Sequence, residues 1–351
     1  MKDYILYQKL LREVEEGRVS AQTTGDLTIF KYTQDCHIQG LWNETNRQAR
    51  GIIFASDGTV VARPFPKFFN LGERPESSPE NLPWNEEVEI YEKVDGSCGI
   101  GYYQKGSWLL ATPGSMESDQ ARVGSIMFAS YNVGIKLPPN CTPVFEIVYP
   151  ENRIVVDYKG ERFLTLLAIF ELSGEEWHPR RVDQIAEKCG FRRPRRYNID
   201  LRGEIPFEEN FEGYVARFAS GLRVKVKSPA YLRVHRLLNY MSPKGVIELI
   251  RGKEYGMTLR ELPQSIQQDF DDIRAYVQTM HDKLRIEAED ITARIPEGDR
   301  KTKALWIQAN TPNALTGMVF GLMDGKDMSD KLWKLVLEKV KDEQGKQLAT
   351  E

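Results

Sequence analysis

Features of an exported or metal-stabilised protein are scarce in this sequence. Its four cysteines and four histidines are scattered, with no CxxC pair and no spacing typical of zinc ligands. No run approaches 18 apolar residues, and the charged N-terminal segment lacks the apolar region of a signal peptide. These absences predict a cytoplasmic protein with reduced thiols and no membrane contact.

Excess charge and common catalytic motifs are lacking too. The net charge is only −3 over 351 residues, so a polyanion would need a local cluster of cations. The phosphate-loop pattern GxxxxGK[ST] is absent, which excludes that route to nucleotide chemistry, and no serine-hydrolase elbow occurs. The apolar fraction of 41% and charged fraction of 28% are those of an ordinary globular protein, and the length suggests two domains.

Residue patterns divide the chain near position 240. An amphipathic helix is expected over 4–16 and a short one over 183–189, ending at Gly190. Between them and up to 234, short β-rich runs dominate: GIIFAS, EVEIYEK, SWLLAT, PVFEIVYP, RIVVDY, FLTLLAIFEL, GYVARF and LRVKVK. We therefore expect an α+β domain with antiparallel sheets over 1–240.

Helical signals alone continue after that point. Ser242 and Pro243 suit a helix cap and first turn, and Thr258–Glu261 has the pattern of a capping box. Apolar residues then recur at steps of three and four along one face of a long helix: Ile266, Phe270, Ile273, Val277, Met280 and Leu284. We expect an all-helical C-terminal domain over 241–351, with RNA binding as one role to consider.

Lys93 is the first candidate for chemistry. It lies in Glu92-Lys93-Val-Asp95-Gly96-Ser, where a predicted strand runs into an Asp-Gly turn. A lysine amine is a nucleophile only when neutral, and neighbouring cations or burial activate it. The alternative is ordinary, because a lysine beside such a turn is common at strand ends.

A second group of basic residues favours a functional role for Lys93. Arg223, Lys225 and Lys227 alternate along a predicted strand, so their side chains share one face. Like charges at this spacing repel unless an anion such as a triphosphate lies opposite. We expect the same cations to depress the pKa of Lys93, although a solvated strand face would also explain the pattern.

Two carboxylates interrupt otherwise apolar strands. Glu146 lies in PVFEIV and Glu212 precedes Gly-Tyr-Val. Burying either acid is costly unless it is paired or bound to a ligand, and Mg²⁺ prefers oxygen ligands. Each could instead lie on an exposed edge. Upstream, Arg50 and Lys67 are cations at the ends of β-like segments.

Taken in order, KVDGS, FEIVYPENRIV, EGYVAR and RVKVKS resemble the covalent nucleotidyltransferases, which include ATP-dependent ligases and mRNA capping enzymes. ARGIIF, PKFFN, PENRIV and KSPAYL make the chain most similar to the phage RNA ligase 1 family, the tRNA-repair type. The likeness runs from about residue 45 to 235. It implies a nucleotidyltransferase domain of ATP-grasp-like ligase type, followed by a small helical domain.

The resemblance also implies roles. Lys93 would take AMP from ATP and pass it to an RNA 5′-phosphate, after which a 3′-hydroxyl would displace AMP. The implied catalytic residues are Lys93, Lys225, Lys227 and Glu212, and Glu212 and Glu146 would hold Mg²⁺, or Mn²⁺ in its place. The implied nucleotide site comprises Arg50, Lys67, Glu92, Lys93, Asp95, Gly96, Glu146, Lys225, Lys227 and Tyr231.

The implied partners are ATP and single-stranded or nicked RNA, with tRNA as a candidate, and the implied state is a monomer in the cytoplasm, that of the host for a phage protein. The run 191–197, FRRPRRY, could follow an RNA backbone or be an exposed linker. Pro113 stands where family members often carry a basic residue, and Lys105 is one substitute.

Other classes remain open. A capping guanylyltransferase or DNA ligase shares the lysine motif but usually adds a β-rich OB-fold, which the helical tail argues against. A non-catalytic RNA-binding protein would be expected to lose Lys93 or a carboxylate, and all are present. A structural protein with coincidental motifs is the remaining alternative.

Overall fold

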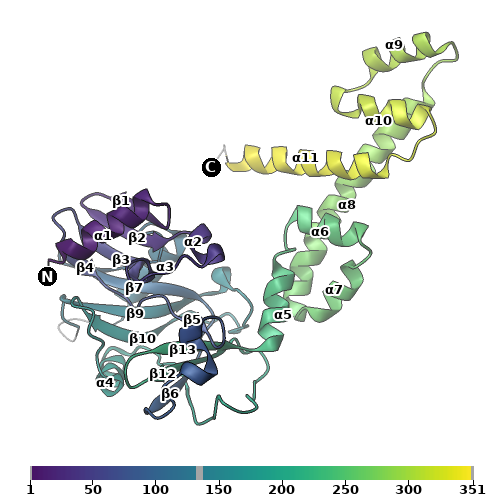
Figure 1. The fold of residues 1–351 in the computed structure, drawn as a ribbon. Helices are drawn as coiled ribbons and strands as arrows, with labels where there is room; N and C mark the ends of the chain where they lie inside the picture. The colour runs from purple at the N-terminus through teal and green to yellow at the C-terminus, as the bar shows by residue number, and fades with distance from the viewer. Residues whose placement is uncertain (1, 132–136, 349–351) are drawn as a thin grey trace. The chain divides into compact units, whose positions relative to one another are not determined.

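The computed structural model describes residues 2–131 and 137–348, and it divides into two compact units, 1–232 and 233–351. Each unit is described by itself. The division falls within helix α5 (Pro229–Leu238), whereas the sequence suggested a boundary near 240. Figure 1 shows sheets and helices in the first unit and helices in the second.

The first sheet has the order β1-β2-β3-β4 and is antiparallel. Helix α1 (Tyr4–Glu15) packs on it through Leu6 and Leu10, as the sequence predicts, and the carboxylate of Asp3 caps the helix by accepting the N–H of Leu6. Its strands and the following small helix are β1 (Val19–Thr24), β2 (Leu27–Tyr32), α2 (Gln34–Gln39), β3 (Arg50–Ala55) and β4 (Val60–Ala62).

The second sheet, in the order β10-β9-β7-β8, is also antiparallel and lies against two helices. One face packs on the first sheet through residues such as Ile100, and the other buries Phe145 and Ile147 under α3 and α4. Helix α4 ends at Gly190, as expected, because that glycine takes the left-handed φ of 82°. The bounds are β7 (Ser97–Gln104), β8 (Ser107–Ala111), α3 (Asp119–Ala129), β9 (Cys141–Val148), β10 (Phe163–Glu171) and α4 (Pro179–Cys189).

The third sheet, in the order β11-β6-β12-β13-β5, carries most of the basic candidates. Its pairings are antiparallel except that β13 and β5 run parallel. One face is apolar and buries Tyr214, Phe218 and Val224, so the alternating residues face the other way. The strands are β5 (Phe69–Asn70), β6 (Val88–Glu92), β11 (Arg196–Tyr197), β12 (Gly213–Phe218) and β13 (Arg223–Lys227).

Short 3₁₀ helices join these elements: η1 (Asn46–Gln48), η2 (Pro75–Ser77), η3 (Pro79–Asn81) and η5 (Pro150–Asn152). The described part of the first unit is therefore α+β with mainly antiparallel sheets, as predicted.

The second unit is helical throughout its described residues. Its long helix buries Ile266, Phe270, Val277 and Leu284 on the predicted face. Ser242 caps the N-terminus of helix α6 by accepting the N–H of Gly245, again as predicted. The helices are α6 (Pro243–Arg251), α7 (Tyr255–Glu261), α8 (Gln264–Ala293), α9 (Arg300–Asn310), α10 (Asn313–Met323) and α11 (Ser329–Leu348).

Two expected elements are wrong. Thr258 starts no helix, because it lies within α7, where its N–H bonds to the carbonyl of Glu254 and its side chain is buried. The segment RIVVDY (153–158) is not a strand, because a carboxylate and not a neighbouring strand accepts two of its amides, as described below.

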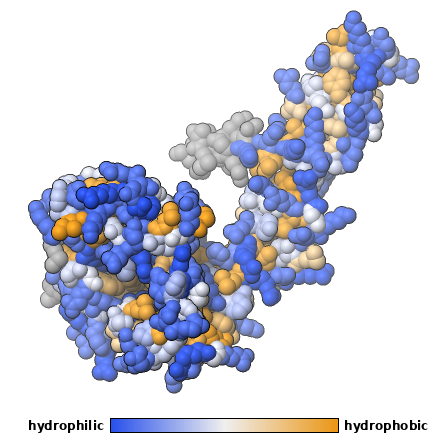
Figure 2. Space-filling model, in the orientation of Figure 1, coloured by the Kyte–Doolittle hydropathy of each residue, from blue (hydrophilic) through white to orange (hydrophobic). Residues whose placement is uncertain are grey.

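Hydrophilic residues cover most of the face of each unit seen in Figure 2. Among the helices that the structure describes, none combines the length and apolar character needed to cross a membrane.

Candidate active site

A pocket of about 200 Å³ brings together residues from all three sheets, from the segment 65–68 and from α4. It is lined by these candidates: Arg50, Lys67, Glu92, Lys93, Glu146, Lys225 and Lys227. The remaining candidates are outside that lining and contact it from behind or beside it: Asp95, Gly96, Glu212 and Tyr231. Predicted site residues up to 177 positions apart in the sequence, from Arg50 to Lys227, therefore share one cavity.

Backbone pairing sets the place of Lys93. It follows β6 directly, and its N–H donates to the carbonyl of Gly213 at 2.8 Å. Gly213 has a φ of 146°, and a Cβ on it would lie 2.0 Å from the carbonyl oxygen of Val226. Only glycine fits there without displacing backbone, so Gly213 allows β12 and β13 to approach closely beside Lys93.

Glu212 holds two lysines at once. Its carboxylate lies 2.8 Å from Lys93 Nζ and 3.0 Å from Lys227 Nζ, and the Glu212 side chain is only 2% exposed. Burial alone would favour a neutral Lys93, but the carboxylates of Glu212 and Glu146 outweigh burial and raise the pKa of Lys93. The expectation that nearby cations depress this pKa is wrong, because the acids act on the amine more strongly than the cations do.

Asp95 organises the loop after Lys93. One carboxylate oxygen accepts the N–H groups of Val155 and Val156, at 2.8 and 2.9 Å, and the other accepts the hydroxyl of Tyr231 at 2.9 Å. These amides belong to the segment that was expected to be a strand. Gly96 is required next to Asp95, since a Cβ there would lie 2.5 Å from the carbonyl oxygen of Ile147 on β9.

Aromatic faces lie against three other basic residues of the pocket, Arg50, Lys67 and Lys225. Arg50 lies over Phe65 at 4.9 Å, and Lys225 lies over Phe68 at 5.6 Å. In the described ranges, Arg50, Lys67 and Lys225 make no ion pair. Burial, together with Lys67 and other cations, lowers the pKa of Lys225 to about 7. An aromatic ring attracts a cation without pairing with it, so no carboxylate has to be displaced when an anion binds these residues.

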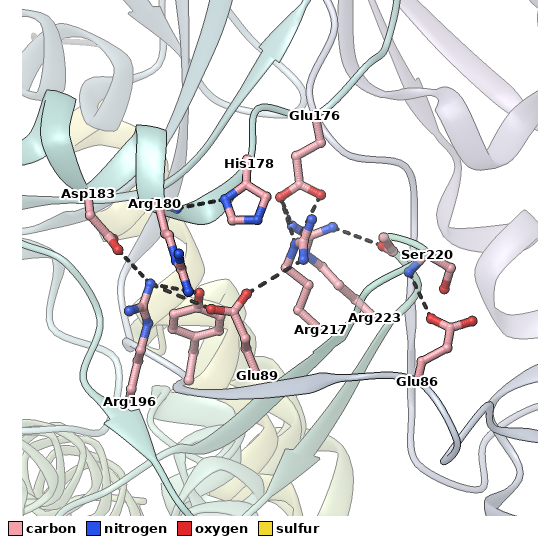
Figure 3. A network of polar contacts seen from close by, with 12 residues as sticks. Glu86, Glu89, Glu176, His178, Arg180, Asp183, Arg196, Arg217, Ser220 and Arg223 are labelled. Atoms are coloured by element: carbon pink, nitrogen blue, oxygen red, sulfur yellow. Dashed lines mark hydrogen bonds and ion pairs between the residues drawn. The ribbon is translucent and has the colours of Figure 1, made fainter.

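Arg223 shares the predicted face with Lys225 but has a different environment. Glu176, just before α4, accepts hydrogen bonds from Arg223 and from Arg217 on β12, as Figure 3 shows. The three side chains are largely buried. Arg223 is therefore already neutralised, and of the three alternating cations Lys225 and Lys227 are the ones that face the candidate nucleophile.

The basic run 191–197 is also engaged. Its arginines pair with acids: Arg192 with Glu161, Arg193 with Asp183, Arg195 with Glu92 and Glu208, and Arg196 with Asp183 and Glu89. Figure 3 shows the Arg196 part of this network beside β6. These contacts tie α4 to β6 and β11 of the third sheet and leave little free charge for an RNA backbone.

Glu146 is a pocket carboxylate whose environment disfavours its charged form. Burial raises its pKa to about 7, against the opposing effect of Lys93. No group of three or more potential metal ligands occurs in the part of the chain that the structure describes. A Mg²⁺ ion would therefore fit here only if phosphates and water supplied most of its ligands, with Glu146 as a protein ligand.

Pro113 lies in the turn between β8 and α3. The substitute cation suggested by the sequence, Lys105, is exposed at the tip of the β7–β8 hairpin and does not line the pocket. Lys31 on β2 lies closer, since a Cβ built on Gly114 would be 3.3 Å from Lys31 Nζ. A basic group therefore does stand beside this turn, but it comes from the first sheet.

The sequence model of a family described as RNA ligase matches residues 48–231, more than half of the chain and the whole span from Arg50 to Tyr231. The chain belongs to the RNA ligase family. A putative RNA ligase of Thermovibrio ammonificans is 31% identical over 252 residues, which cover 68% of this chain and 66% of that protein.

Other members of the RNA ligase family and one solved structure extend the comparison. An RNA ligase of Rhodothermus phage RM378 is 25% identical over 308 residues, covering 67% of this chain and 69% of the phage protein. An archaeal ATP-dependent RNA ligase structure aligns at a TM-score of 0.48 and 14% identity, over 86% of this chain and 85% of that one. The chain thus spans about two thirds of the length of the first two relatives.

Several residues of the site gave no sequence signal. Glu176, Tyr32, Trp42 and the aromatic residues of PKFFN contact the cations, yet they belong to segments far from the lysine motif. Only the density of aromatics in FPKFFN beside Lys67 could have suggested that rings surround a cation there.

Proposed function

We propose that this chain is an ATP-dependent RNA ligase that joins a 5′-phosphate and a 3′-hydroxyl through a covalent Lys93–AMP intermediate. One observation carries the proposal. Lys93 opens into a pocket with three further basic residues, Arg50, Lys67 and Lys225, which lie against aromatic faces and make no ion pair in the described part of the chain. A triphosphate is the anion that such a group of cations suits best.

In the first step, the neutral amine of Lys93 attacks the α-phosphorus of ATP. The N–P bond forms as the bond to the bridging oxygen breaks, and pyrophosphate leaves with the electron pair. Because the pKa of Lys93 is raised, the amine must first give up a proton. Glu212, at 2.8 Å, is placed to accept it, and it is a better candidate for this task than for binding a metal.

Lys225 and Lys227 would contact the α-phosphate and stabilise the charge of the transition state. Arg50 and Lys67 would contact the leaving pyrophosphate. Mg²⁺, held by Glu146 and the phosphates when bound, would offset negative charge on the triphosphate. Asp95, Gly96 and Tyr231 would support the lysine loop from behind, and Glu92 would contact the nucleotide beside it.

In the second step, an oxygen of the RNA 5′-phosphate attacks the phosphorus of Lys93–AMP, and the N–P bond breaks as the lysine amine leaves. In the third, the 3′-hydroxyl attacks the 5′-phosphorus, loses its proton, and AMP departs. The best-suited substrate is single-stranded RNA with these ends, and cleaved tRNA is a substrate of this kind. The monomer would act alone, and the helical unit is a candidate surface for RNA.

The test is to incubate the protein with α-labelled ATP and Mg²⁺ and then denature it. Wild type and the matched control Lys9→Ala, an exposed change on α1, should retain acid-labile label, and Lys93→Ala should retain none. The double variant Lys225→Ala/Lys227→Ala should also lose labelling. Absence of label in wild type with Mg²⁺ and Mn²⁺, or label that survives in Lys93→Ala, would overturn the proposal.

A second assay reports on the RNA. A 5′-phosphorylated single strand and a nicked duplex, offered side by side, should show joining of the single strand. Joining of the nick alone would contradict the substrate assignment while leaving the adenylylation step intact.

A further inference from the structure

Lys67 lies in an unusual setting for a cation. It is only 6% exposed, and its ammonium makes no ion pair among the described residues. Three aromatic rings surround it instead, with their centroids 5.3–5.4 Å from Nζ: Tyr32, Trp42 and Phe69. We call these three residues the aromatic cage. Such rings are within the range at which a cation and an aromatic face attract each other.

The three residues of the aromatic cage come from three separate segments of the chain. Tyr32 ends β2, Phe69 starts β5, and Trp42 lies in the loop before η1. Trp42 makes edge-on contacts with both of the others, at 4.9 Å to Tyr32 and 5.5 Å to Phe69. Trp42 therefore holds the cage together, although only Tyr32 and Lys67 of this group line the pocket.

The aromatic cage can orient the Lys67 side chain without neutralising its charge. A carboxylate in the same place would neutralise Lys67 and would have to be displaced by an incoming phosphate. The rings stabilise the ammonium and leave its charge in force. Burial lowers the pKa of Lys67, and the carboxylate of Glu73, which makes no ion pair with it, acts in the opposite direction.

We propose that Trp42 is a positioning residue for the ATP-dependent step, acting through Lys67 to hold a cation ready for pyrophosphate. The inference rests on the proposed function and deepens it. Pyrophosphate is present when ATP adenylylates Lys93 and in the reverse reaction, but it is absent when pre-adenylylated RNA is sealed. Loss of the cage should therefore affect one part of the reaction sequence and spare the other.

The experiment compares Trp42→Leu, Trp42→Phe and the control Trp84→Leu, a similarly half-buried indole outside the pocket. Each protein is assayed for label transfer from ATP, for exchange of labelled pyrophosphate into ATP, and for joining of pre-adenylylated RNA without ATP. Trp42→Leu should lose about three- to thirtyfold in kcat/KM for ATP and for pyrophosphate. Its joining of pre-adenylylated RNA should stay within about twofold of wild type.

Trp42→Phe should recover most of the loss, because it restores an aromatic face, and Trp84→Leu should behave as wild type. Three outcomes would overturn the inference: equal losses in all assays, no loss for ATP or pyrophosphate, or a phenylalanine variant as impaired as the leucine variant. The exchange assay needs no RNA. If wild type exchanges pyrophosphate but cannot join pre-adenylylated RNA, the proposed ligase activity fails while the role of Trp42 is still decided.

Discussion

Lys225 offers a quantitative test of how the pocket receives ATP. Its pKa of about 7 means that about nine in ten Lys225 amines are neutral at pH 8. A triphosphate beside it favours the ammonium, so binding should take up about 0.9 proton at pH 8 and about 0.1 at pH 6. Above pH 7, affinity should therefore fall by up to about tenfold per pH unit.

Replacing Lys225 with arginine removes this linkage, because a guanidinium stays charged throughout the range. Calorimetry with an α,β-methylene analogue of ATP, in buffers of different ionisation enthalpy, measures the protons taken up without chemistry at Lys93. Wild type and Lys225→Arg should differ by close to one proton at pH 8 and hardly at pH 6. Glu146 also titrates near pH 7, but it is present in both proteins and cancels in the difference. Equal uptake at pH 8 would refute the reasoning.

Three further changes test the support around Lys93. Gly213→Ala should cost about 3 kcal/mol or more of stability in urea denaturation and abolish labelling, because its Cβ would overlap the carbonyl of Val226; Gly203→Ala, with open space around it, should do neither. Asp95→Ala should lower the unfolding free energy by about 2–4 kcal/mol, since two buried amides lose their acceptor, and a loss below about 0.5 kcal/mol would contradict this. Glu176→Ala should lower the melting temperature, because Arg223 loses its carboxylate partner and Arg217 keeps only Glu89, and an unchanged melting temperature would argue against that pairing.

Which residues share a face of a strand could be predicted from the sequence. The alternation of RVKVK predicted that Arg223, Lys225 and Lys227 share a face, and the pairing of β13 confirms it. What the pattern could not predict is which of these cations is free. Glu176 comes from a segment some 47 residues away, and no local signal links it to Arg223.

Competition for backbone amides explains the strand that was wrongly predicted. RIVVDY has the β-branched residues of a strand, but Asp95 accepts two of its N–H groups and thereby replaces a neighbouring strand. Such a bond between positions about 60 residues apart cannot be read from either segment alone.

The predicted direction of the pKa shift at Lys93 was wrong for a related reason. The sequence shows many cations and two acids but not their distances, and Glu212 is at 2.8 Å from the amine. Coulomb energy rises steeply as charges approach, so one adjacent acid outweighs several cations farther away.

The hydrogen bond between Lys93 and Gly213 has a consequence for redesign. It fixes the register of the β6–β12 pairing, in which Glu92 is opposite Tyr214 and each residue advances the strand by about 3.4 Å. An insertion of one residue in β6 would turn its side chains to the apolar face, and an insertion of two would restore the face but displace the amine by about 7 Å. Libraries built on this scaffold should therefore keep the length of these strands, because a change of length there would uncouple the amine from the cations of the pocket.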